Sequence, residues 1–388
     1  MLTVTIVAHD VGARVGGMES QLERLAQGLL DEGARVIVIA RRCELPAQQR
    51  LTWLRVRTPA RPFAIGYPLF ALAASWIVAR RGAGVVHATG AIVFNRVDCI
   101  TVHFCHVAYR AQGLGSRPSS PGRLFALNAA VASLQSAWAE RWCYRRSRVR
   151  ATIAVSPGVR EEMEHYFPGL AGAVTMIPHG VDTDRFRPDP ARGAAVRARL
   201  GLAPDDLVAV FVGGDWARKG LRRAIDAVAG APGWSLLIVG HGHEETYAQH
   251  ARELEVQERV LFAGVTRDVP AYLAAADVFL LPTRYETFCL VAFEAAAAAL
   301  PLLVTRVSGP DLIVEPGRNG DFIDDDAART AALLDGYRDA ERRHRHGARA
   351  RQRAAEFSWP AAQAAHLRLY AELARTSVEA AAEAVTLR

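Results

Sequence analysis

The sequence predicts two α/β domains in series, each built on a parallel β-sheet. The chain has 388 residues, which is too long for one ordinary hydrophobic core and suits two domains of common size. Short apolar runs typical of buried strands alternate with helical segments in both halves. Two prolines, a glycine and several polar residues interrupt the apolar pattern between residues 176 and 188, where we place the boundary.

The N-terminal half begins with a strand, a loop that contains glycines, and a helix. Residues 4–8 form the first apolar run, and the loop covers residues 9–17. Residues 18–32 place four leucines on one helical face, and Gly33 suits the end of that helix because glycine readily adopts the left-handed conformation. Later strands are predicted at residues 36–40, 85–88, 99–103 and 151–156.

The C-terminal half repeats this alternation. Its predicted strands lie at residues 207–212, 235–240, 260–264, 278–282 and 302–305. A helix-rich tail follows and includes residues 361–373. The resulting domain assignment is residues 1–178 for the first domain and 179–360 for the second, with a final helical segment at 361–388.

Composition and charge narrow the class of protein. Hydrophobic residues make up 51% of the chain and charged residues 22%, which describes a globular protein. The formal net charge is +7, which favours anionic partners such as nucleoside diphosphates or acidic lipid surfaces. We find no nucleic-acid-binding motif, so we expect no nucleic acid partner.

The five cysteines lie at positions 43, 99, 105, 143 and 289. Their odd number and irregular spacing favour neither a disulfide framework nor a zinc site. The chain also enters directly as a strand, without a visible signal peptide. We therefore expect reduced cysteines and a cytoplasmic protein.

Two segments suggest contact with a membrane. Residues 63–79 are apolar and flanked by arginines, but they reach only the lower limit of a spanning helix and include Pro68, so a buried or interfacial helix is favoured. Residues 141–150 are basic and include Trp142 and Tyr144. Such a segment suits a helix on a membrane surface, and a solvated helix face is the alternative. Peripheral association with the anionic inner face of a membrane is one expectation for this chain.

Glu286 and Glu294 form the most informative pair in the sequence. They lie eight positions apart, after the predicted strand at 278–282, and a helix-forming alanine run follows them. Glu286 is expected in the loop at the carboxyl end of that strand, and Glu294 inside the next helix. Ligands of open α/β sheets bind at this edge. The two carboxylates suit the two ends of a polar ligand that presents vicinal hydroxyls, such as a sugar or a ribose.

A second loop at the same kind of edge carries cations. Residues 213–220 read Gly-Gly-Asp-Trp-Ala-Arg-Lys-Gly and follow the strand at 207–212 directly. Backbone N–H groups at a helix start, together with Arg218 and Lys219, suit a diphosphate. Charge that develops on a departing diphosphate would be stabilised there. A solvated basic helix start is the alternative interpretation.

These features together resemble glycosyltransferase family 4, the retaining glycosyltransferases with a Glu-x7-Glu signature (glycosyl transferases group 1). The resemblance covers nearly the whole chain in order: Gly16-Gly17, Thr101-Val-His103, His179-Gly-Val-Asp182, Arg218-Lys219-Gly220, and Glu286 with Glu294. It implies the GT-B fold, two Rossmann-like domains facing across a cleft, with the last helix packed back on the N-terminal domain. That domain would bind the acceptor, and the C-terminal domain the donor.

The resemblance also implies roles for individual residues. Glu286 and the backbone N–H groups of Phe288, Cys289 and Leu290 would hold the sugar and diphosphate, and Glu294 the ribose. Gly16, Gly17 and Gly213 would approach the phosphates, while Arg218 and Lys219 would stabilise the departing diphosphate. His103 would reach the donor sugar, with His106 as its competitor and a structural histidine as the alternative. The family usually has an Arg where Gly214 stands, which leaves open how Arg218 and Lys219 divide their tasks.

The function implied is a retaining hexosyltransferase that uses a nucleoside-diphosphate sugar. The acceptor would be a hydroxyl of a carbohydrate or a lipid-linked sugar, in the synthesis of cell-envelope polysaccharide, lipopolysaccharide or glycolipid. The resemblance implies no metal in the site and no cofactor besides the donor.

Two other classes of protein are weighed against this one. A nicotinamide-dependent enzyme would need Gly-x-Gly-x-x-Gly after the first strand, and residues 10–17 lack it. A non-catalytic protein that binds nucleotide sugars or a membrane surface would keep the Arg-Lys loop without needing both glutamates.

Overall fold

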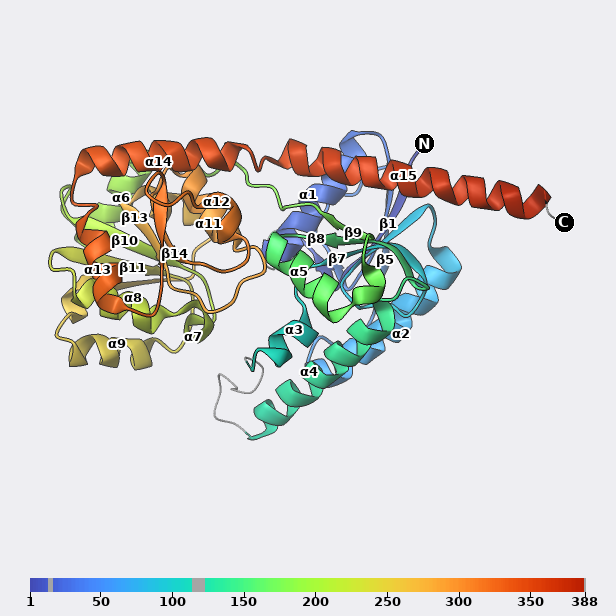
Figure 1. Cartoon of the computed structure of the whole chain (residues 1–388), viewed down its shortest axis with the longest axis horizontal. Coiled ribbons are helices and arrows are strands. Elements are labelled where there is room, and N and C mark those ends of the chain that lie inside the picture. The colour runs from blue at the N-terminus through green and yellow to red at the C-terminus, as the bar shows by residue number, and fades with distance from the viewer. Residues whose placement is uncertain (13–16, 114–122, 387–388) are drawn as a thin grey trace. The chain divides into compact units, whose positions relative to one another are not determined.

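The chain folds into two compact units (Figure 1). The computed structural model describes residues 1–12, 17–113 and 123–386, and it describes only the backbone of residues 123–126 and 377–386. Unit 1 comprises Met1–His179 and Pro360–Arg388, and unit 2 comprises Gly180–Trp359. The chain therefore leaves unit 1 once, at the glycine-containing turn after His179, and returns to it with the last helix.

Unit 1 is built on a parallel sheet of seven strands in the order β5-β3-β1-β6-β7-β8-β9. Most of these strands are β-branched runs that are buried on both faces, as parallel sheets require. Their bounds are β1 Thr3–Val7, β3 Arg35–Ala40, β5 Leu51–Arg55, β6 Val85–Thr89, β7 Val97–Val102, β8 Val149–Ala154 and β9 Val174–Met176. The short strands β2 (Asp10–Val11) and β4 (Arg42–Cys43) pair separately.

Helices cover both faces of this sheet (Figure 1). They are α1 Gly17–Asp31, α2 Phe63–Arg81, α3 His106–Ala111, α4 Arg123–Cys143, α5 Pro157–Tyr166, a 3-10 turn at Pro168–Leu170, and α15 Trp359–Thr386. The leucines predicted on one face of the first helix are buried against β1 and β3, together with Tyr370 and Leu373 of α15.

The last helix is part of the unit 1 core. The Tyr370 hydroxyl lies 2.7 Å from Nδ1 of His87 on β6, and Gln363 Nε2 donates to the carbonyl of Gly28 on α1 at 3.0 Å. Arg150 Nη1 donates to the Leu373 carbonyl at 3.0 Å. These contacts tie α15 to the sheet and to α1.

Helix α2 corresponds to the apolar segment singled out in the sequence. By length and composition it could cross a membrane, but a core helix passes the same test. Phe70, Ala71 and Ala74 are fully buried in unit 1, and the Tyr67 hydroxyl donates to the Ala91 carbonyl. One face of α2 is therefore core.

Unit 2 carries a second parallel sheet, of six strands in the order β12-β11-β10-β13-β14-β15. The strands are β10 Leu207–Val212, β11 Trp234–Val239, β12 Val260–Gly264, β13 Val278–Leu281, β14 Leu302–Thr305 and β15 Gly320–Ile323. The four central strands, β10, β11, β13 and β14, contribute nearly all their residues to the core.

The helices of unit 2 also lie on both sides of their sheet (Figure 1). They are α6 Pro190–Leu200, α7 Trp216–Lys219, α8 Leu221–Ala229, α9 Glu244–Glu253, a 3-10 turn at Gln257–Arg259, α10 Val269–Ala274, α11 Leu290–Ala297, α12 Pro310–Ile313, α13 Ala327–Asp335 and α14 Ala340–Ala355. Each unit is thus a Rossmann-like βα assembly with a parallel sheet, which confirms the predicted fold class of each domain.

Candidate functional site

The predicted donor residues of unit 2 meet at one point of its sheet edge. Strand β10 pairs with β11 on one side and with β13 on the other, so the direction of winding reverses between β10 and β13. The loops after these two strands start at Gly213 and Pro282, at the carboxyl ends. Loops that leave a parallel sheet at such a reversal form its usual ligand-binding crevice.

Glycines fix the shape of the first loop. Gly213 has φ 146°, and a β-carbon there would lie 2.5 Å from Cδ of Lys219. Gly220 has φ 78°, and a β-carbon there would lie 2.0 Å from the Pro282 carbonyl oxygen. The short helix α7 between them is therefore held close to β13, with the Lys219 side chain folded against Gly213.

This geometry brings both predicted cations to Glu286. Oε1 of Glu286 accepts hydrogen bonds from Lys219 Nζ at 2.9 Å and Arg218 Nη1 at 3.1 Å. Thr283 donates to the same oxygen at 3.2 Å. Arg218 is anchored further by the Tyr285 carbonyl at 2.6 Å and the Asp215 carboxylate at 3.0 Å. The sequence did not single out Thr283 or Asp215.

Electrostatics keep Glu286 ionised. Burial alone would raise the pKa of this carboxyl, but Lys219 and Arg218 outweigh that effect and lower it. Burial likewise opposes the charge of Arg218, while Glu286 and Asp215 raise its pKa above the usual value. The cluster is a hydrogen-bonded group in which two cations, Arg218 and Lys219, are matched by two carboxylates, Glu286 and Asp215.

The pKa of Glu294 is shifted in the opposite direction to that of Glu286. Glu294 sits inside α11, as predicted, and burial raises its pKa to about 7, against the opposing effects of Arg185 and Lys219. The two carboxylates of the Glu-x7-Glu pattern therefore have pKa values on opposite sides of the ordinary one. Such separation within one site is typical of functional groups.

The start of α11 is held by an unusual backbone. Cys289 precedes the helix with φ 61°, a left-handed conformation, and Gly309 approaches so closely that a β-carbon would lie 1.9 Å from the Phe288 carbonyl oxygen. The Phe288 ring stacks on Phe293 at 4.3 Å. Burial raises the pKa of the Cys289 thiol to about 12, so this sulfur stays protonated at neutral pH. Residues 288–290 are thus placed rigidly at a helix N-terminus.

Unit 1 carries a pocket at the corresponding point of its own sheet. Strand β1 lies between β3 and β6, and the loops after β1, β6 and β7 surround a cavity of about 150 Å³. Its walls also come from α2 and α4. The lining residues are His9, Met18, Phe63, Tyr67, Thr89, Gly90, Ala91, Ile92, His103, Phe104, His106, Ser136, Glu140 and Tyr144.

Both histidines singled out in the sequence line this pocket. His103 follows β7, and its Nδ1 lies 3.2 Å from Nε2 of His179, with the two rings stacked. Among the described residues, Nε2 of His103 has no hydrogen-bond partner. Burial lowers the pKa of His103 to about 3 and that of His106 to about 4, so both rings are neutral near pH 7.

Glu140 is a pocket residue that the sequence did not indicate. It lies in α4 and accepts hydrogen bonds from the backbone N–H groups of His106 at 2.8 Å and Val107 at 2.9 Å. Burial raises its pKa to about 7 despite those two bonds. Its position depends on how α4 packs against α3, which no local pattern encodes.

The glycines expected near the phosphates are only partly covered. Gly16 lies outside the described residues, and Gly17 begins α1 with its backbone exposed. Within the described part of the chain, no three His, Cys, Asp or Glu side chains are grouped as metal ligands.

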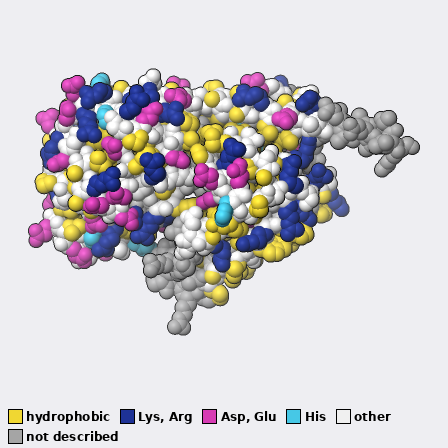
Figure 2. All heavy atoms as spheres, in the orientation of Figure 1, with side chains coloured by type: hydrophobic (Ala, Val, Ile, Leu, Met, Phe, Trp, Pro, Cys, Tyr) yellow, Lys and Arg dark blue, Asp and Glu magenta, His cyan; other side chains and the backbone are white. Residues whose placement is uncertain are grey.

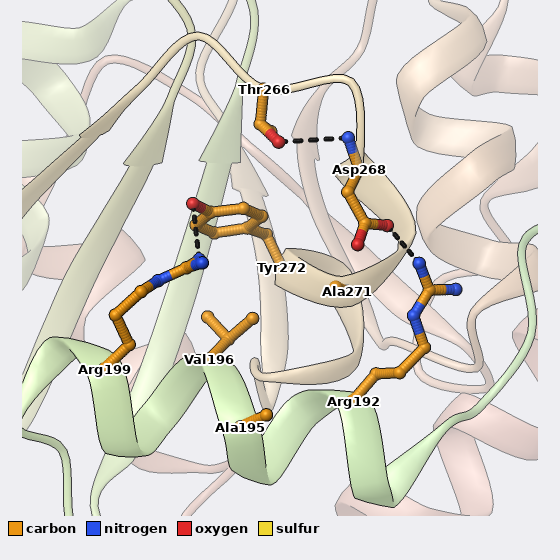
Figure 3. Close-up of a pocket in the computed structure, with 8 residues that line it drawn as sticks. All are labelled: Arg192, Ala195, Val196, Arg199, Thr266, Asp268, Ala271 and Tyr272. Carbon is orange, nitrogen blue, oxygen red and sulfur yellow. Dashed lines mark hydrogen bonds and ion pairs between the residues drawn. The ribbon is translucent and has the colours of Figure 1, made fainter.

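Unit 2 has a cavity of its own, of about 190 Å³, between α6 and α10 (Figure 3). Its two arginines are already engaged, Arg192 with Asp268 and Arg199 with the Tyr272 hydroxyl. None of the predicted site residues lines it.

Comparison with known proteins agrees with the fold. The family model described as Glycosyltransferase Family 4 matches residues 15–185, and the one described as Glycosyl transferases group 1 matches residues 194–353. A D-inositol 3-phosphate glycosyltransferase of Kineococcus radiotolerans is 28% identical over 92% of this chain and 90% of its own length.

A second relative matches over a shorter region. The GDP-mannose-dependent alpha-(1-6)-phosphatidylinositol monomannoside mannosyltransferase of Mycolicibacterium smegmatis is 36% identical over 45% of this chain, and the match spans half of that enzyme. Among solved structures, WaaG, a glycosyltransferase involved in lipopolysaccharide biosynthesis, superposes with a TM-score of 0.78 at 20% identity, covering 93% of this chain and 98% of its own. The two consecutive family models, together with the Rossmann-like fold of each unit, show that this chain belongs to glycosyltransferase family 4.

Proposed function

We propose that this enzyme is a retaining glycosyltransferase that moves a hexose-type sugar from a nucleoside diphosphate to an acceptor hydroxyl. The observation that carries the proposal is the cluster of Glu286, Arg218 and Lys219 at the sheet edge of unit 2. Glu286 and Asp215 hold Arg218 and Lys219 at one point of this edge, where the two cations are placed to stabilise the negative charge that grows on a departing diphosphate.

Each of the two glutamates would bind a different part of the donor. Glu286 would face the sugar and the diphosphate, next to the N-terminus of α11, whose dipole favours negative charge. Glu294 would accept hydrogen bonds from the two ribose hydroxyls. A carboxylate offers enough lone pairs to accept from both hydroxyls at once.

We propose the following reaction at this site. The bond between the anomeric carbon and the diphosphate oxygen breaks, and the acceptor oxygen bonds to that carbon on the same face. The transition state is oxocarbenium-like. The hydroxyl proton passes to the departing phosphate oxygen, which gains negative charge. No protein nucleophile is required, and the reaction changes no oxidation state, so we propose that it uses no cofactor besides the donor.

The pocket of unit 1 is proposed as the acceptor site. It combines neutral His103 and His106 with Glu140 and several aromatic rings, which suits a polar ring with hydroxyls. Since the named relatives include enzymes of inositol glycoside, mannoside and lipopolysaccharide synthesis, we propose a role in cell-envelope polysaccharide, lipopolysaccharide or glycolipid synthesis. We propose a cytoplasmic location, with peripheral attachment to the membrane.

A transfer assay with matched carboxylate variants tests the proposal. Glu286→Gln should abolish sugar transfer while the thermal midpoint stays close to that of the wild type. Glu315→Gln is the control, because Glu315 also forms an ion pair in unit 2, with Arg349 at 2.5 and 2.7 Å, but lies outside the site. The anomeric configuration of the product, measured by NMR, should equal that of the donor. Wild-type turnover in Glu286→Gln, or an inverted product, would contradict the proposal.

A further inference from the structure

Helix α2 of unit 1 carries an exposed apolar stripe. Four large side chains follow each other at intervals of four, three and four residues, which places them on one side of the helix. They are Ile65, Leu69, Leu72 and Trp76, with exposed fractions of 55%, 44%, 61% and 59%. The opposite side of α2 is the buried one that packs into unit 1. Contiguous exposed apolar surface of this kind marks an interaction site.

Helix α4 carries a second stripe beside the first. Leu127, Leu134 and Trp138 lie at intervals of seven and four residues and are 62%, 56% and 59% exposed. The start of α2 touches the first half and the middle of α4, where the Ala64 amide donates to Asn128 Oδ1 at 3.2 Å and Gln135 Nε2 donates to the Ala64 carbonyl at 3.0 Å.

The helices run in the same direction. Further along them, the Phe94 amide donates a hydrogen bond to the Ser75 hydroxyl oxygen at 2.8 Å, and the Phe94 ring packs edge-on against Trp138 at 6.1 Å. The carboxyl ends of α2 and α4 therefore lie on the same side of this surface. We call the surface formed by Ile65, Leu69, Leu72, Trp76, Leu127, Leu134 and Trp138, with the arginines at the helix ends, the α2–α4 face.

Arginines gather at the shared end of the α2–α4 face. They are Arg80 and Arg81 after Trp76, and Arg141, Arg145 and Arg146 after Trp138, all exposed. Arg80 lies over the Trp76 ring at 4.5 Å, and Arg145 over Trp142 at 5.3 Å. In the described part of the chain, none of the five forms an ion pair with a carboxylate. Figure 2 shows hydrophobic and basic side chains mingled over this part of unit 1.

Negative charge is missing from the same surface. Residues 61–81 contain no Asp or Glu, and Glu140 is the only acidic residue between 127 and 150. Glu140 is buried and turned to the pocket. In the described part of the chain, the arginines that border this apolar surface have no carboxylate partner, although Arg141, Arg145 and Arg146 donate to backbone carbonyls. An apolar surface with exposed tryptophans and such arginines suits the interfacial region of an anionic bilayer.

We propose that the α2–α4 face docks on the surface of an anionic phospholipid bilayer and that the acceptor is a lipid of that bilayer. The docking part assigns a surface to the peripheral membrane attachment proposed above, and the acceptor part rests on the proposed glycosyl transfer. Both helices also wall the proposed acceptor pocket, with Phe63 and Tyr67 from α2 and Ser136 and Glu140 from α4. A bilayer held by their outer sides would present lipid head groups beside that pocket.

Two other occupants fit the surface less well. Insertion of α2 across the bilayer would pull the fully buried Phe70 and the hydrogen-bonded Tyr67 out of unit 1. A second copy of the chain, docked symmetrically through the same face, would bring the arginine clusters together. Like charges without carboxylates between them oppose such a dimer.

Vesicle sedimentation tests the docking. The full chain should sediment with phosphatidylglycerol-containing vesicles at low salt and much less with pure phosphatidylcholine vesicles. Leu72→Glu, Leu134→Glu and the double variant Arg80→Glu/Arg81→Glu should each lower the bound fraction, with an affinity loss of about tenfold or more. Leu254→Glu and Arg345→Glu in unit 2 are the controls for apolar loss and charge reversal, and should bind as the wild type does.

The outcomes separate the proposal from its alternatives. Equal loss in the unit 2 controls would mean that net charge alone drives binding, and would overturn the proposal. No sedimentation with either vesicle would overturn it too. The proposal would also be overturned if light scattering found a dimer of the wild type and a monomer of Leu72→Glu. Brominated lipids should quench tryptophan emission in the wild type, and Trp76→Phe/Trp138→Phe should remove most of that quenching.

The acceptor class has its own readout. With radiolabelled donor sugar and vesicles of a bacterial polar lipid extract, label should enter the organic phase, and Leu72→Glu should reduce this transfer. Label that enters only water-soluble acceptors would overturn the lipid acceptor while docking stands. Failure of the proposed function itself would show differently, as no nucleotide binding and no transfer to any acceptor.

Discussion

At the scale of single residues, two glutamates eight positions apart have pKa values shifted in opposite directions. Glu286 is held ionised by Lys219 and Arg218, whereas burial raises the pKa of Glu294 to about 7. The sequence predicted where both would lie, because one follows a strand and the other enters a helix. It could not predict their protonation, because the cations that decide it lie 67 and 68 positions away from Glu286 in the chain.

Glu294 predicts a pH dependence of donor binding. Ribose hydroxyls need the ionised carboxylate, so a bound nucleotide favours loss of the proton and its affinity should fall as the pH drops below 7. Well below the pKa, the loss approaches about tenfold per pH unit. Calorimetric titration at pH 8 and pH 6 measures it.

The control for this prediction is Glu294→Gln, which cannot titrate at that position. At pH 8, Glu294→Gln should bind the nucleotide more weakly than the wild type does. Its affinity should change with pH only to the extent that the nucleotide phosphates gain or lose protons. If wild type and Glu294→Gln respond to pH in the same way, Glu294 does not hold the ribose.

At the scale of elements, the clearest sequence signals were the central strands and the least clear were the elements that lie partly exposed. Strands β10 and β13 are continuous apolar runs bounded by Gly or Pro, and the sequence predicted them closely. Helix α4 went unpredicted, since its apolar side chains occupy the exposed face as well as the buried one. Edge strand β5 was missed because it is half exposed. That β10 and β13 are neighbours is a matter of strand order, which no local pattern encodes.

The turn that joins α7 to α8 gives a prediction about shape. Gly220→Ala should lower the free energy of unfolding by about 2 kcal/mol or more, because it adds left-handed strain and a clash with the Pro282 carbonyl. It should also weaken nucleotide binding by displacing Lys219. Gly201→Ala is the matched control, with φ 70° and nothing within 4 Å of its β-carbon, and should cost only about 1–2 kcal/mol of strain without affecting nucleotide binding. Equal effects of both changes would argue against a steric role for Gly220.

Three histidines of unit 1, one buried and two half-buried, are hydrogen-bonded near the ends of its strands. His87 bonds Thr101 and Tyr370, and His103 bonds His179. Burial lowers the pKa of His87, His103 and His179. These histidines therefore stay neutral in the folded state at a pH near 6.5, where the same residues of the unfolded chain bind protons. Their contribution to stability is complete above that pH and is lost as the pH falls.

His179→Asn should make the protein less sensitive to acid. Each buried neutral histidine costs about 1.4 kcal/mol of unfolding free energy per pH unit below 6.5. Removing one should reduce the difference between urea midpoints at pH 7.5 and 5.5, whereas the exposed His344→Asn should leave it unchanged. An unaltered difference in His179→Asn would mean that His179 is protonated in the folded state.

At the scale of the whole molecule, each of the two Rossmann-like units carries one candidate site of the proposed reaction. Unit 2 assembles cations and carboxylates at the winding reversal between β10 and β13, and unit 1 forms a pocket at the equivalent point after β1 and β6. The sequence predicted this division because each half shows its own βα series. The sequence suggested membrane contact for residues 63–79, but it did not predict Glu140 or the pairing of α2 with α4, since both depend on how helices distant in sequence pack together.

The most direct test of the central claim, a nucleotide-sugar site in unit 2, is a thermal-shift panel with UDP, GDP, ADP, dTDP and their common sugar conjugates. A nucleotide at a hundred times its dissociation constant adds about 2.7 kcal/mol to the folded state and raises the midpoint by several degrees. We predict such a shift with one base, its loss in Lys219→Ala, and its retention in Glu315→Gln. If no nucleotide moves the midpoint, or if Lys219→Ala responds as the wild type does, the cluster of Glu286, Arg218 and Lys219 is not a donor site.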